Sequence, residues 1–170
     1  MEALDIALLI IRIWAAVVII AHGVNHARTL DGTAKWFASK GFRQPRLNAR
    51  MSAFMELAIG VGLALGLLTS VASAALAATM FVAFWTIHRF AGFFNFHRPD
   101  EGYEYVTTLA VLALVLVILG PGSASLDDTL DFADKLDGWV GVAIYAGGLL
   151  TAAGQLAVFW RKPSGEETTS

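Results

Sequence analysis

Five blocks of apolar residues, each about as long as a bilayer is thick, constrain this chain more than any other feature. They cover residues 5–27, 50–69, 71–94, 105–119 and 138–160. A transmembrane helix needs about 20 mostly apolar residues, and the 56% hydrophobic content exceeds the roughly 45–50% of soluble domains. We therefore predict an all-α integral membrane protein: a four-helix transmembrane bundle plus a fifth C-terminal transmembrane helix.

The charged residues between these blocks predict an orientation. Lys and Arg favour the cytoplasmic side of a membrane. The first loop holds six of the twelve basic residues and the fourth loop holds five aspartates, which predicts an external N-terminus and a cytoplasmic C-terminus. The basic residues are Arg28, Lys35, Lys40, Arg43, Arg46 and Arg50, and the aspartates are Asp127, Asp128, Asp131, Asp134 and Asp137.

The same pattern divides the chain into four parts. Residues 1–125 form the predicted four-helix core, and residues 126–137 form an acidic amphipathic outer loop. Residues 138–160 form the additional transmembrane helix, and residues 161–170 form a disordered tail. In the outer loop, Ser125 followed by Asp128 fits a capping box, and apolar residues then recur at helical spacing. One short surface helix is expected there.

The first loop also contains aromatic residues among its cations. Trp36, Phe37 and Phe42 favour a short segment at the inner membrane surface. The alternative is a basic topology loop whose aromatic residues have no special role.

Five ionisable residues fall inside the predicted spans. Charged groups are costly in lipid and usually face the interior of a bundle. At roughly 1.5 Å per residue, one layer near the cytoplasmic face holds His22, Glu56 and His88, with Asn25 and Arg89 beside it. Arg12 is a second intramembrane charge nearer the outer surface.

Two interpretations of this buried polar layer stay open. It locks helices together, or it binds a quinone-like headgroup, a proton or a small polar ligand. A buried carboxylate stays charged beside a cation, so we expect Glu56 to pair with Arg89 or His22. His26, one turn further along, is expected at the water boundary.

Metal and cofactor chemistry receives less support. Haem ligation by His22 and His88 is the less favoured alternative, since pairing with Glu56 explains the histidines as well. The pair His22 and His26 lacks two ligands for zinc, and the chain has no cysteine. We predict no metal and no bound cofactor, with a quinone as the open alternative.

Small residues predict where helices pack closely. Ala58, Gly62 and Gly66 are spaced four apart in the second block, which allows backbones to approach.

Four short motifs lie within about residues 6–130: His22-Gly23 after an intramembrane arginine, Lys40–Pro45, Met55–Thr69 and Gly120–Asp128. Together, in this order, they resemble the DoxX family of small integral membrane proteins. The resemblance implies a bacterial inner-membrane four-helix bundle. Relatives include the small membrane subunit of a thiosulfate:quinone oxidoreductase, accessory factors of redox enzymes, and partners of oxidative-stress proteins.

The resemblance favours a membrane subunit or accessory factor of a quinone- or sulfur-linked redox system, rather than a stand-alone enzyme. The alternative is a non-catalytic membrane adaptor or assembly factor. The expected partners are the lipid bilayer and redox-enzyme or stress proteins, with no role for nucleic acid.

Overall fold

The computed structural model describes residues 2–96 and 101–163, and within these ranges the regular elements are helices. In chain order they are α1 (Ala3–Arg28), α2 (Leu30–Ser39), α3 (Pro45–Leu65), α4 (Thr69–Thr86), the 3-10 helix η1 (His88–Phe90), α5 (Glu104–Leu119), α6 (Leu126–Thr129), α7 (Ala133–Leu136) and α8 (Gly138–Phe159). The all-α prediction is confirmed. Most of the tail predicted to be disordered lies outside the described residues.

Within the described residues, three helices are long and apolar enough to cross a membrane: α1, α4 and α8. Helix α5 is apolar but has only 16 residues. Helix α3 has 21 residues, and Arg46, Arg50 and Glu56 interrupt its apolar sequence. Each of the five predicted spans therefore corresponds to a helix. Three of these helices have the length and composition of a transmembrane helix.

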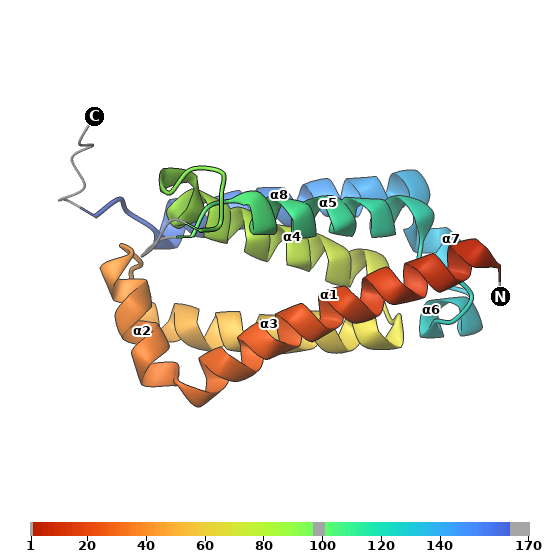
Figure 1. Cartoon of the computed structure of the whole chain (residues 1–170), viewed down its shortest axis with the longest axis horizontal. Coiled ribbons are helices and arrows are strands. Elements are labelled where there is room, and N and C mark those ends of the chain that lie inside the picture. Colours follow the sequence, from red (N-terminus) through yellow and green to blue (C-terminus); the bar gives the residue numbers. More distant parts are fainter. Residues whose placement is uncertain (1, 97–100, 164–170) are drawn as a thin grey trace.

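The long helices form two layers (Figure 1). Helix α1 packs along α3, while α4 packs against both α5 and α8. Short α6 and α7 lie at one end and α2 lies at the other. Side chains from α1, α3, α4 and α5 fill one core between the layers, including Ala15, Leu63, Leu76 and Leu116. Direct contact between α1 and α5 is slight, so a seam runs between them.

Glycines allow the close approach of α1 and α3. A Cβ atom on Gly60 would collide with the Ile20 side chain, and one on Gly23 would lie 3.0 Å from the Glu56 Cβ. The predicted packing residues lie elsewhere. Ala58 is exposed, Gly62 faces Ala72 across the α3–α4 turn, and Gly66 ends α3 in a left-handed conformation.

Helix α8 packs against α4 and α5 and is also bonded to the first loop. Its C-terminal end pairs with the turn before α3, where Phe42 and Trp160 form an antiparallel bridge. The Arg43 amide donates to the Phe159 carbonyl at 2.6 Å, and the Arg161 amide donates to the Gly41 carbonyl at 3.0 Å. The last long helix is thereby tied to the first loop.

The first loop differs from the expected surface segment. Phe37 and Phe42 are buried, with ring centroids 4.8 Å apart, and they pack with Leu156 of α8. Trp36 is exposed. Two of the three aromatic residues thus serve a second small core instead of the membrane interface.

The outer loop contains two single-turn helices where one helix was predicted. The chain breaks at Asp131, whose φ is 56°, a left-handed conformation that aspartate tolerates better than most residues. Ser125 caps α6 as predicted, because its Oγ accepts from the Asp128 amide at 3.1 Å.

Arg12 holds this outer loop against the bundle. Its side chain is completely buried and donates to the Pro121 carbonyl at 2.8 Å and the Ala124 carbonyl at 2.6 Å. Asp127, also buried, accepts from the Leu68 and Thr69 amides, each at 2.7 Å. These bonds satisfy amides at the start of α4 and fix the turn in which Leu68 has a φ of 48°. The two charges join α1, the α3–α4 turn and the loop.

Candidate functional site

A cluster of polar and aromatic side chains from α1, α3, η1 and α5 lies near the C-terminal end of α1. We call it the His–Glu–Tyr cluster. It consists of His22, His26, Ser52, Glu56, His88 and Tyr105.

The centre of the cluster is the pair formed by Glu56 and His26. Glu56 is 4% exposed, and its Oε2 lies 2.9 Å from His26 Nδ1. Ser52, one turn earlier on α3, donates to Glu56 Oε1 at 2.8 Å. Oε2 has no aligned hydrogen bond, so the contact with His26 is mainly electrostatic. This pair is where α1 is fixed to α3, beside the close approach at Gly23.

Three aromatic rings extend the cluster from α1 to α5 and η1. The His22 ring stacks on Tyr105 at a centroid distance of 6.2 Å, with the two planes 11° apart. The His88 ring meets the same Tyr105 edge-on at 5.7 Å. His22 also contacts His26 at 6.4 Å. Tyr105 therefore lies in contact with two histidines from different elements.

The backbone fixes the tautomer of His88. Its Nδ1 lies 2.6 Å from the Glu101 carbonyl oxygen. Because a carbonyl can only accept, Nδ1 carries a proton. In the neutral ring Nε2 is then a hydrogen-bond acceptor. The buried ring is held in one orientation by the segment that precedes α5.

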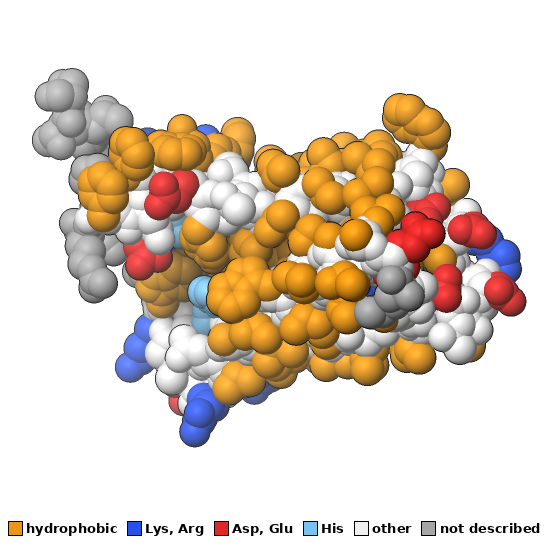
Figure 2. Space-filling view, turned by 45° about the vertical axis from the view of Figure 1, so that its right-hand side comes forward, with side chains coloured by type: hydrophobic (Ala, Val, Ile, Leu, Met, Phe, Trp, Pro, Cys, Tyr) orange, Lys and Arg blue, Asp and Glu red, His pale blue; other side chains and the backbone are white. Residues whose placement is uncertain are grey.

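A groove of about 460 Å³ follows the seam between α1 and α5 and reaches the cluster at Tyr105. Its lining is mostly apolar, and Glu104 and Thr108 add polar groups. The full lining is Trp14, Val18, Phe93, Glu104, Tyr105, Thr108, Leu109 and Leu112. Figure 2 shows histidine side chains at the surface among hydrophobic ones. A lipid-soluble molecule in this groove would touch Tyr105.

The structure places the predicted layer only in part as expected. His22, Glu56 and His88 belong to one connected cluster, but only Glu56 and His88 are buried, and His22 is exposed. Asn25 is exposed, and its carbonyl accepts from Thr29. Arg89 turns away, with its guanidinium 4.1 Å from the Trp85 ring centroid and 4.5 Å from that of Phe90. The partner of Glu56 is His26, not Arg89 or His22.

His26, Ser52 and Tyr105 were not predicted as members of the site. Residues four apart share a helix face. His26 is four residues after His22, and Ser52 is four residues before Glu56. This spacing could have indicated that His26 and Ser52 belong to the site. Nothing in the sequence pairs Tyr105 with His22. Among the described residues, no three His, Asp or Glu side chains are grouped to hold a metal ion.

This geometry defines a class: an all-α protein with apolar helices long enough to cross a membrane and a polar cluster that includes buried Glu56 and His88. The family described as DoxX matches residues 7–89, which confirms the resemblance over this part of the chain. No curated protein and no solved structure matches the chain. The matched segment contains His22, His26, Glu56 and His88, whereas Tyr105 and the α5 side of the groove lie beyond it.

Proposed function

We propose that this protein is a bacterial inner-membrane subunit or accessory factor of a redox system, and that its His–Glu–Tyr cluster receives the ring of a quinone-like carrier. Five helices cross the membrane in this proposal: α1, α3, α4 and α5 as the core, and α8 as the fifth. The N-terminus is external and the C-terminus cytoplasmic. The chain binds the carrier and catalyses no reaction alone.

The observation that supports this proposal is the position of Tyr105. It lines the apolar groove and also contacts His22 and His88. Ligand sites are mostly apolar clefts with a few converging polar groups. A groove on the lipid-facing seam would take an aliphatic tail, and the cluster at its end would take a polar ring.

A labelling experiment tests the groove. A photoreactive short-tailed benzoquinone should label α1 and α5 in purified protein, mapped by mass spectrometry. The variant Leu112→Trp, which fills the groove, should reduce labelling at least about fivefold, because the added ring competes for the same apolar space.

The matched control is Leu150→Trp on the exposed side of α8. It adds the same ring outside the groove and should leave labelling unchanged. Labelling that is equal in both variants, or that maps to other helices, would contradict the proposed site.

The charge distribution favours a second candidate, a non-catalytic adaptor. Basic residues gather in the first loop and aspartates in the outer loop, which offers oppositely charged surfaces to different partners. Co-purification separates the candidates: a retained quinone or redox enzyme supports the first, and soluble partners without a carrier support the second.

The orientation is tested by thiol labelling, since the chain has no cysteine of its own. In intact cells, Lys40→Cys should be protected from an impermeant maleimide and Asp131→Cys should be labelled, because the basic loop is placed inside. After permeabilisation both should react. Labelling of Lys40→Cys alone in intact cells would reverse the proposed topology.

A further inference from the structure

We propose that the groove between α1 and α5 selects for a ring that donates hydrogen bonds, and so binds the hydroxyl-bearing, reduced form of a quinone-like carrier in preference to the carbonyl-bearing form. This inference rests on the proposed function. It concerns the hydrogen-bonding character of the polar end of the groove.

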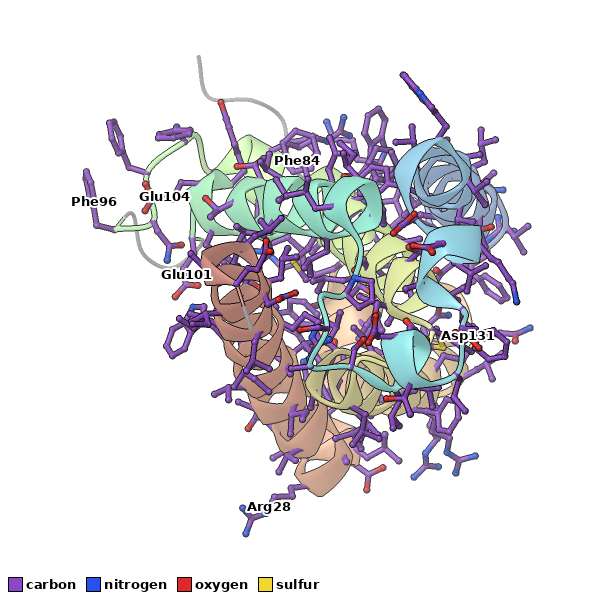
Figure 3. The ribbon with its side chains drawn as sticks, turned by 90° about the vertical axis from the view of Figure 1, so that its right-hand side faces the viewer. Arg28, Phe84, Phe96, Glu101, Glu104 and Asp131 are labelled. Atoms are coloured by element: carbon purple, nitrogen blue, oxygen red, sulfur yellow. The ribbon has the colours of Figure 1, made fainter. Side chains whose placement is uncertain are left out.

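The first acceptor at this end is Glu104, in the first turn of α5. Its carboxylate is half-buried and lines the groove. The Asn95 amide donates to Glu104 Oε1 at 3.0 Å, which holds the side chain at the start of the helix. Figure 3 shows Glu104 and Glu101 on the same side of the molecule and Asp131 on the other. A carboxylate offers only acceptors.

The second acceptor is Thr108, one turn further along α5. Its hydroxyl donates to the Glu104 carbonyl at 2.7 Å, so the hydroxyl proton is already used and its lone pairs remain for a ligand. Tyr105 lies between these residues in sequence and can either donate or accept. His88 lies behind Tyr105 and is not part of the groove lining, and its Nδ1 proton is held by the Glu101 carbonyl.

A carbonyl-bearing ring could accept from the Tyr105 hydroxyl or the Trp14 indole N–H, but it meets the other two polar groups of the groove badly. Its oxygens are acceptors and would face the Glu104 carboxylate and the Thr108 oxygen with no proton between them. A hydroxyl-bearing ring supplies that proton. Sites that hydrogen-bond a ligand hydroxyl reject analogues lacking it, most strongly when water is excluded. Because this groove is open to its surroundings, we expect a smaller preference, about tenfold.

Direct binding, measured by isothermal titration calorimetry without the benzoquinone probe, gives the preference. Under anaerobic conditions, an alkyl hydroquinone is compared with its dimethyl ether, which keeps the ring and the tail but lacks the donors. The hydroquinone should bind with a Kd about one-tenth of that of the ether. In Glu104→Gln, whose amide can also donate, the ratio should fall to about twofold or less.

Glu101→Gln is the matched control, because the Glu101 side chain is exposed and does not line the groove. This variant should keep the tenfold ratio. Equal Kd values for the two compounds in the wild-type protein would overturn the inference and leave the proposed function standing. Failure of the benzoquinone to label α1 and α5 would overturn the proposed function, and the inference with it.

Discussion

Replacing Arg12 by methionine should lower the free energy of unfolding by about 3–5 kcal/mol, the range measured when one partner of a buried charge network is removed. The guanidinium is fully buried and donates to two loop carbonyls. Methionine would leave the Pro121 and Ala124 carbonyls without donors and Asp127 without a neighbouring positive charge. Thermal denaturation in detergent, followed by circular dichroism, measures the loss.

Arg28→Met is the control for this prediction, because Arg28 lies exposed at the far end of the same helix. It should change stability by less than about 0.5 kcal/mol. A loss of similar size in the two variants would mean that the outer loop does not depend on Arg12.

The second large effect is expected at Glu56 and His26. Changing His26 to glutamine should lower the free energy of unfolding by about 3 kcal/mol. This is the lower end of the range for a broken buried pair, because the His26 side chain is 20% exposed. The double variant with Glu56→Gln should cost less than the sum of the single variants, with a coupling of about 0.5–3 kcal/mol. A double-mutant cycle on thermal stability gives this coupling directly.

Arg89→Gln provides the comparison, since Arg89 stacks on Trp85 and Phe90 and makes no ion pair with Glu56 in the structure. Its cycle with Glu56→Gln should be additive within about 0.5 kcal/mol. Coupling of Glu56 to Arg89 but not to His26 would contradict the arrangement of the cluster.

Helix positions could be predicted from the sequence because apolar blocks of bilayer length leave few alternatives. The depth estimated for each residue along its helix also predicted that His22, Glu56 and His88 lie close together. Depth alone does not give the rotation of a helix about its axis. Arg89 follows His88 directly, yet the 3-10 turn at His88–Phe90 aims the two side chains in different directions.

The partner of Glu56 could not be predicted from the sequence, because it depends on how closely α1 and α3 approach. Gly23 lets the α3 backbone come near α1, and this brings Glu56 within reach of His26 rather than of Arg89 on η1. Likewise, the outer aspartates looked like one acidic surface. Asp127 is instead buried as a cap for α4, a role set by a turn nearly 60 residues earlier in the chain.

The bridge between Phe42 and Trp160 also limits the order in which the molecule can be completed during biosynthesis. Residues 41–43 leave the ribosome long before residues 159–161, so the bonds that join them cannot form until translation is almost finished. Until then the turn before α3 lacks its backbone partners, and Phe37 and Phe42 lack the cover of Leu156. The end of the nascent bundle that holds α2 and the turn before α3 is therefore the last part to close.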